Sequence, residues 1–179
     1  VQQEAERRGF RIFDATCPLV TKVHVEVAKL FKEGYEFLMI GHKGHPEVEG
    51  TMGQLSEGIH LVEDIDDVAK VQPKQTDLLA VVTQTTLSVD DTAGILAAVK
   101  ARFPKVREPK QQDICYATQN RQDAVKLLSP QVDIVIVVGS PTSSNSNRLR
   151  EVAHRLGTDA YMVDNAGELQ ADWFEGKQR

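Results

Sequence analysis

Two hydrophobic patterns alternate along the chain. Between residues 19 and 32 the apolar side chains recur at intervals of three or four, which places them on one stripe of an amphipathic helix. The segments 37–40, 78–82 and 134–138 are instead short uninterrupted apolar runs, which predict buried strands. The predicted helices cover 2–8, 19–32, 48–55, 65–71, 89–102, 119–128, 147–156 and 168–174. The predicted strands cover 11–14, 37–40, 58–62, 78–82, 134–138 and 160–163, and a weaker strand begins at Val106.

This alternation predicts an α/β fold built from parallel sheets, because a helix between two strands returns the chain to the same edge of the sheet. Ligands of such folds bind at the carboxyl ends of the strands. Three polar loops begin there, at Gly41, Thr83 and Gly139. The sequence therefore predicts that a binding site is built from these three loops.

Composition and charge exclude several classes of protein. Of the 179 residues, 41% are hydrophobic and 26% are charged, which is ordinary for a globular protein and unlike a disordered or collagen-like chain. No apolar run approaches the ~20 residues that a membrane-spanning helix needs. The net charge is −5 and the lysines and arginines are scattered, so we expect neither nucleic acid nor a membrane surface as a partner. No secretory leader precedes the cysteines and Val1 falls inside a predicted helix, so we expect a cytoplasmic protein and a chain cut from a longer one.

The two cysteines, Cys17 and Cys115, begin matching stretches of sequence. Each precedes a predicted helix and strand, and each lies 24 positions before a glycine, Gly41 or Gly139, that opens a polar loop. Any two α/β units resemble each other at this level, but the equal spacing favours an internal repeat. The predicted units are the closing helix and strand of a truncated first unit (1–17), a second unit (18–114) and a third unit truncated at its C-terminal end (115–179).

The sequence alone is compatible with three roles for the two cysteines. Buried inert thiols are the default for an intracellular protein, and a disulfide is the least favoured, since cytosolic chains rarely keep one. Cysteines at helix starts have lowered pKa values and act as thiolates, so shared ligation of a metal or an iron–sulfur cluster is the third role. A cluster takes three or four thiolates and the chain holds two, so this role requires a ligand from outside the chain.

The polar loops carry the candidate chemistry. The loop 139–146 contains four serines, a threonine and an asparagine before a predicted helix, which suits a phosphate group but also a simple helix cap. In 41–47, two histidines, a lysine and Glu47 suit anion binding and proton transfer better than a zinc site, because Pro46 interrupts the helical spacing of zinc ligands. The loop 83–86 adds uncharged donors. For any single residue, the alternative is an ordinary solvated loop.

Five motifs, in order along the whole chain, resemble the LytB/IspH family. They are Asp14-Ala-Thr-Cys-Pro18, Gly41-His-Lys-Gly-His-Pro-Glu-Val-Glu-Gly-Thr51, Thr83-Gln-Thr-Thr-Leu-Ser-Val-Asp-Asp91, Asp113-Ile-Cys-Tyr-Ala-Thr-Gln-Asn-Arg121 and Gly139-Ser-Pro-Thr-Ser-Ser-Asn-Ser-Asn-Arg148. The resemblance implies an iron–sulfur oxidoreductase of isoprenoid biosynthesis by the methylerythritol phosphate route. Its reaction removes the allylic hydroxyl of 4-hydroxy-3-methylbut-2-enyl diphosphate with two electrons and two protons, which gives isopentenyl and dimethylallyl diphosphate.

The resemblance also implies how individual residues act. The family folds as three similar units around a [4Fe–4S] cluster held by three cysteines, of which Cys17 and Cys115 match two while the third lies outside this chain. Glu47 matches the acid that relays protons to the substrate hydroxyl, and Thr85 matches the residue that orients it. The residues that match the diphosphate-binding groups are His45, Ser143, Ser144 and Asn145. Thr142 stands where many members carry asparagine, and the pattern around it is kept.

Electrons are expected from a ferredoxin or flavodoxin-type protein. As a fragment, the chain is expected to be inactive alone and to lack the cluster, because one cysteine ligand and part of the substrate contacts lie outside it. The alternative is a redox-inert α/β module that binds a phosphorylated metabolite through 143–145 and uses no metal.

Overall fold

Helices and strands alternate along the chain in the computed structural model, which describes residues 2–109 and 113–179. The α-helices are α1 (Gln2–Arg7), α2 (Pro18–Lys32), α3 (Pro46–Met52), α4 (Ile65–Lys70), α5 (Val89–Arg102), α6 (Tyr116–Leu128) and α7 (Ser144–Arg155). The strands are β1 (Glu36–Ile40), β2 (Ile59–Val62), β3 (Leu79–Thr83), β4 (Ile134–Val138) and β5 (Asp159–Val163). Short 3₁₀-helices are η1 (Ser129–Gln131), η2 (Ala166–Glu168) and η3 (Ala171–Phe174).

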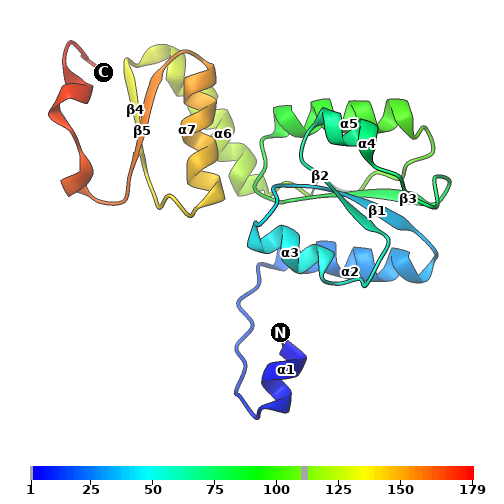
Figure 1. Cartoon of the computed structure of the whole chain (residues 1–179). Helices are drawn as coiled ribbons and strands as arrows, with labels where there is room; N and C mark the ends of the chain where they lie inside the picture. Colours follow the sequence, from blue (N-terminus) through cyan, green and yellow to red (C-terminus); the bar gives the residue numbers. More distant parts are fainter. Residues whose placement is uncertain (1, 110–112) are drawn as a thin grey trace.

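The strands form two parallel sheets, one with the order β2-β1-β3 and one that pairs β4 with β5 (Figure 1). The first sheet lies between α2 and α3 on one face and α4 and α5 on the other, and α6 and α7 lie beside the second sheet. The predicted α/β fold with parallel sheets is therefore confirmed. Within the described residues, no helix is both long enough and apolar enough to cross a membrane.

Local sequence sets both ends of α2. Pro18 opens the helix, where its missing N–H is not needed and its fixed φ suits the first turn. Val23, Val27 and Leu30 are the buried stripe, as the apolar spacing predicts. Gly34 then adopts a φ of +89°, a left-handed conformation that ends helices and that residues with a side chain rarely adopt.

β1 is the centre of the first sheet and is buried on both faces. Its side chains alternate between two apolar clusters, because successive residues of a strand point to opposite faces. Phe37 and Met39 pack with the stripe of α2. Leu38 and Ile40 pack with apolar residues of α4 and α5. The core of this unit is therefore two layers that share one strand.

Replacing Phe37 with alanine is expected to lower the free energy of unfolding by about 3–5 kcal/mol, because Phe37 is 0% exposed and its removal leaves a cavity that the rigid sheet cannot close. Urea unfolding followed by circular dichroism measures the change. The matched control is Phe31→Ala on α2, since that side chain is 38% exposed and should cost far less. Equal unfolding midpoints for the two variants would contradict the packing described above.

The second sheet is covered by α7 and α6, and the chain after β5 folds back onto it. The ring of Trp173 stacks on Tyr161 of β5, with the ring centroids 4.2 Å apart. This contact explains one wrong prediction. The segment 168–174 is not an α-helix: it contains the 3₁₀-helix η3 and the last residue of η2. Forming the first turn of an α-helix costs free energy that so short a segment does not recover, and the contact between Trp173 and Tyr161 fixes the path of the chain instead.

Two predicted strands are also absent. The segment 11–14 is extended but pairs with no described strand, and Phe13 is 77% exposed there. A strand needs a neighbour to accept and donate its backbone hydrogen bonds, which periodicity cannot reveal. Near Val106 the chain makes a single bridge, between Arg107 and Ala80, and Pro109 follows two residues later without an N–H to extend the ladder.

Candidate functional site

The polar loops that follow β1 and β3 lie side by side. Parallel pairing aligns Ile40 with Thr83, so the two strands end at the same level. Gln84 extends the ladder by one residue, donating its backbone N–H to Ile40 O at 2.8 Å. The loops 41–45 and 84–88 therefore share one edge of the sheet, where the sequence predicts a binding site.

Glu47 and Thr85 meet at this edge. Glu47 lies in the first turn of α3, and Thr85 lies in the loop after β3. Thr85 donates its backbone N–H to Glu47 Oε1 at 2.7 Å and its hydroxyl to Glu47 Oε2 at 3.1 Å. Both carboxyl oxygens are therefore held by one residue, which fixes the orientation of the acid.

The environment of Glu47 favours its protonated form. Burial raises the pKa of the Glu47 carboxyl above its ordinary value, and the two hydrogen bonds from Thr85 offset part of that rise. A carboxyl with a raised pKa keeps its proton closer to neutral pH, which is the property that a general acid needs. The position of the Glu47 carboxyl and its raised pKa therefore both suit proton transfer at this edge of the sheet.

His45 is the N-cap of α3. Its Nδ1 accepts the backbone N–H of Glu47 at 3.2 Å, so in the neutral ring the proton is on Nε2. Burial lowers the pKa of His45, and the neighbouring His42 lowers it further. His45 is therefore a neutral N–H donor at pH 7.

Gln84, one of the uncharged donors of the loop 83–86, connects the loops after β1 and β3 with the start of α7. It is 0% exposed, and its amide oxygen accepts the backbone N–H of His42 at 3.0 Å. Its amide nitrogen donates to Thr86 Oγ1 at 2.9 Å and to Ser144 Oγ at 3.3 Å. Thr86 also donates to Ser144 Oγ at 3.0 Å. A glutamine directly after a buried strand was the signal that could have identified it.

A cavity of about 490 Å³ lies where the start of α7 faces the loop after β1. His45 and Ser144, two of the four predicted diphosphate-binding residues, are among its walls. The remaining described wall residues are His42, Thr142, Asn147, Arg148 and Glu151. Donors from both sheet units therefore face the same space.

The other two predicted residues, Ser143 and Asn145, are not among the described walls of that cavity. Ser143 Oγ accepts the backbone N–H of Ser146 at 3.3 Å and its hydroxyl at 3.1 Å, so it caps α7. Asn145 Oδ1 is buried and, among the residues that the structure describes, meets no hydrogen-bond donor. Their predicted role as diphosphate-binding groups stays a prediction.

The glycines that open two of the loops are required by close approach. A Cβ on Gly41 would lie 2.5 Å from Val48 Cγ2, and a Cβ on Gly139 would lie 2.2 Å from Ser146 Oγ. In both loops the following helix comes up against the end of the strand. The equal spacing of these glycines from the cysteines thus corresponds to the same local packing in both units.

Both cysteines are free thiols at the N-cap positions of long helices. Cys17 precedes α2 and is exposed, and Cys115 precedes α6 and is half-buried. Neither side chain makes a capping hydrogen bond. The backbone N–H of Cys115 donates to Thr85 O at 2.9 Å, which places this cysteine beside the Glu47–Thr85 pair. No disulfide joins the two cysteines.

The cysteines fit part of an iron–sulfur site. Both thiols are free, and iron–sulfur clusters take cysteine thiolates as ligands. Across 2–109 and 113–179, no group of three or more histidine, cysteine, aspartate or glutamate side chains is arranged to hold a metal ion. Two thiolates without further ligands do not hold a [4Fe–4S] cluster, so the cluster needs ligands that these residues do not supply.

Asp113 is buried two residues before Cys115 and faces Lys22 of α2, the helix that Cys17 begins. Its side chain is 1% exposed, and its Oδ2 accepts the backbone N–H of Thr83 at 3.2 Å. Burial raises the pKa of Asp113 to about 6, against the opposing effects of the Thr83 hydrogen bond and the Lys22 charge. Asp113 opens the fourth of the five family motifs.

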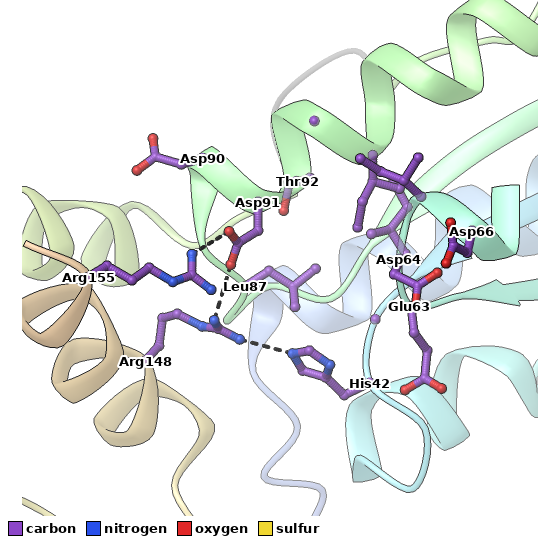
Figure 2. Close-up of a pocket in the computed structure, with 15 residues that line it drawn as sticks. His42, Glu63, Asp64, Asp66, Leu87, Asp90, Asp91, Thr92, Arg148 and Arg155 are labelled. Atoms are coloured by element: carbon purple, nitrogen blue, oxygen red, sulfur yellow. Dashed lines mark hydrogen bonds and ion pairs between the residues drawn. The ribbon is translucent and has the colours of Figure 1, made fainter.

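A second cavity, of about 600 Å³, also has His42 and Arg148 among its walls (Figure 2). Arg148 of α7 contacts His42 Nε2 at 3.0 Å and Asp91 Oδ2 of α5 at 3.2 Å, and Arg155 also pairs with Asp91. Figure 2 shows both arginines pointing from α7 toward Asp91. These contacts, with those of Ser144, connect α7 to the first sheet unit.

Comparison with known proteins assigns the family. The model of the LytB protein family matches residues 1–179. A 4-hydroxy-3-methylbut-2-enyl diphosphate reductase of Polaromonas sp. is 82% identical over 179 residues, which are 100% of this chain and 54% of the relative. The corresponding protein of Methylibium petroleiphilum is 79% identical with the same coverage.

A solved structure supports the same assignment. The E-1-hydroxy-2-methyl-but-2-enyl-4-diphosphate reductase of Plasmodium falciparum superposes with a TM-score of 0.94 at 37% identity, and the match covers 98% of this chain and 55% of that one. The chain spans about half the length of the curated relatives it matches. With a family model that matches every residue, the chain belongs to the LytB protein family.

Proposed function

We propose that a protein carrying this chain is a 4-hydroxy-3-methylbut-2-enyl diphosphate reductase. The relatives that carry this name are 82% and 79% identical to the chain. The reaction replaces the allylic hydroxyl by hydrogen: two electrons and two protons enter, the C–O bond breaks, and water leaves with isopentenyl or dimethylallyl diphosphate. The observation that carries the proposal is the half-buried Glu47, held by Thr85 immediately beside Cys115.

Glu47 acts as the proton donor. Hydroxide is a poor leaving group, so the departing oxygen must be protonated or bound to a metal. The raised pKa lets Glu47 hold a proton that it can pass to this oxygen, and the Thr85 hydroxyl orients the same oxygen. Because Thr85 N–H fixes the carboxyl, the proton is delivered without a search among rotamers.

The diphosphate occupies the cavity lined by His45 and Ser144. The neutral His45 N–H, the Ser144 hydroxyl and the N-terminus of α7 supply donors from two units, which suits a group with several anionic oxygens. Ser143 and Asn145 belong to the same helix start and complete the proposed set. Arg148, which is also a cavity wall, adds positive charge.

Cys17 and Cys115 would hold the [4Fe–4S] cluster together with a ligand from outside these residues. When bound, the cluster supplies electrons and Lewis acidity at the substrate oxygen. We propose a ferredoxin or flavodoxin-type electron donor and a cytoplasmic location, which suits thiols that are free rather than paired. We also propose that the units divide at 17/18 and 114/115.

The proposal is tested by anaerobic reconstitution of a full-length protein that carries these 179 residues, followed by turnover of the diphosphate substrate with a chemical reductant. We expect turnover by the reconstituted protein, none by the metal-free protein, and none by the 179-residue chain alone. A full-length protein that binds the cluster but leaves the substrate unchanged would overturn the proposal.

His45→Ala is expected to weaken binding of inorganic diphosphate by about tenfold, because a half-buried donor worth roughly 1–2 kcal/mol is lost. Isothermal titration calorimetry on metal-free protein measures the dissociation constant. His154→Ala, an exposed histidine of α7, is the matched control and should leave the affinity unchanged.

The same titration tests the second candidate function, a redox-inert module that binds a phosphorylated metabolite. The finding that favours it is the donor-lined cavity at the start of α7. That function predicts diphosphate binding without any cluster in the full-length protein. Cluster loss on cysteine replacement, described in the Discussion, separates the two functions.

A further inference from the structure

An ion pair connects the two cysteine-bearing segments. Lys22 lies on α2, five residues after Cys17, and Asp113 lies two residues before Cys115. Lys22 Nζ is 3.8 Å from Asp113 Oδ1. The Asp113 side chain is 1% exposed, whereas that of Lys22 is 36% exposed. Within the pair, Lys22 is therefore at the surface of α2, and Asp113 is in the interior, close to the start of α6.

On the Cys115 side, the chain is fixed to the end of β3 at two points. Thr83 N–H donates to Asp113 Oδ2 at 3.2 Å, and Cys115 N–H donates to Thr85 O at 2.9 Å. These bonds hold Asp113 to the last residue of β3 and hold Cys115 to Thr85, which also holds Glu47. The position of Cys115 is thus set by the first sheet.

On the Cys17 side, the start of α2 lies outside the core. The first buried residue of the helix is Val23, and residues 11–18 are largely exposed. Lys22 lies in the second turn of α2, directly before this buried stripe, so its contact with Asp113 holds the N-terminal half of the helix that Cys17 begins. The pair links a cysteine on an exposed helix start to one held by the sheet.

The ion pair between Lys22 and Asp113 contributes little to the stability of the fold. Asp113 Oδ1 is buried and makes no hydrogen bond with the described residues. Burying a carboxylate opposite one partly exposed lysine costs desolvation energy that such a pair scarcely recovers. Groups that are costly to bury and close to reactive residues are characteristic of functional sites.

We propose that Lys22 and Asp113 are positioning residues that fix the separation and orientation of Cys17 and Cys115. This inference rests on the proposed function only in assuming that the two cysteines serve one shared group. In this inference, the buried carboxylate of Asp113 positions the two cysteines and has no part in catalysis or in the stability of the fold.

The 179-residue chain offers a direct test because it contains two cysteines. Nitroxide labels on both thiols allow pulsed electron–electron double resonance to measure the distribution of distances between the two labels. We expect a narrow distribution in the parent chain. Lys22→Met, which keeps the length of the side chain but removes its charge, is expected to broaden the distribution by about twofold, because the buried carboxylate loses its partner.

The matched variants separate positioning from other effects. Lys22→Arg should restore the narrow distribution, and Lys29→Ala, at an exposed position of the same helix, should not change it. Asp113→Asn should broaden it as Lys22→Met does, and the double variant should be no broader than either single one. Circular dichroism checks that each chain is folded. Coinciding distributions for the parent chain and Lys22→Met would overturn the inference.

A second readout uses the full-length protein. Lys22→Met is expected to speed the release of iron from the reconstituted cluster to a chelator by about tenfold, as for other groups that orient metal ligands, and Lys22→Arg should not. Equal release rates would also overturn the inference. In that case the proposed function stands if cysteine replacement still removes the cluster. If cysteine replacement leaves the cluster in place, the proposed function fails, whatever the label distances show.

Discussion

Replacing Cys115 with serine is expected to remove the iron–sulfur cluster from a full-length protein that carries this chain. A serine oxygen is a poor ligand for iron, and a lost ligand should lower cluster affinity by more than about 100-fold, the upper end of the effect of residues that only orient ligands. Iron content, visible absorption after anaerobic reconstitution, and substrate turnover measure the loss. Cys17→Ser should behave in the same way.

The structure shows how to distinguish a role of Cys115 as a cluster ligand from a role in stabilising α6. Cys115 makes no capping hydrogen bond at the start of α6, and serine is a favoured N-cap residue. Cys115→Ser should therefore leave the thermal stability of the metal-free protein unchanged or slightly higher. Ser88→Ala is the opposite control: Ser88 Oγ accepts Asp91 N–H and caps α5, so its loss should cost about 1 kcal/mol of stability while the cluster remains. Cluster retention in both cysteine variants would remove the ligand assignment.

Glu47→Gln is the second change with a large expected effect. We expect kcat to fall by about 10²–10⁴, because a glutamine cannot deliver a proton, while KM changes little. Glutamine is nearly isosteric and can still accept the Thr85 N–H that orients Glu47. Steady-state kinetics with a chemical reductant, at saturating and limiting substrate, separate kcat from KM. A variant with parental kcat would exclude Glu47 as the proton donor.

The pH dependence provides a second measurement for Glu47. Because burial raises the pKa of this carboxyl, its protonated form persists above the ordinary titration range and is lost as the pH rises through the raised value. The limb of kcat that falls with rising pH should therefore be absent in Glu47→Gln. The same shift makes the contribution of Glu47 to stability greatest below the ordinary glutamate pKa, and this contribution declines as the pH rises through the raised value. Urea unfolding at several pH values checks the sign.

Much of the architecture was predictable from the hydrophobic pattern. The run 134–138 became β4 with the same boundaries, and the spaced apolar residues of 19–32 became α2 with the predicted buried stripe. Such elements are local, and they follow from burial of a periodic apolar face. The segment 11–14 shows the limit, because its extended chain needed a partner strand that local sequence does not specify.

The candidate site was predictable in its parts but not in its contacts. Motifs pointed to Glu47 and Thr85, yet only the alignment of Ile40 with Thr83 in parallel strands brings the two side chains together. The sequence pattern does not distinguish Gln84 from the other polar residues of 83–86, because its role depends on reaching Ser144, which lies 60 residues away.

The sequence by itself determined the alternation of helices and strands, the polar loops at the strand ends and the five motifs that identify the family, since each is encoded within a short stretch of chain. The tertiary structure alone decided which donors share a cavity and that Lys22 faces a buried Asp113. Those contacts join residues far apart in the chain, and their distances follow from strand register and helix packing.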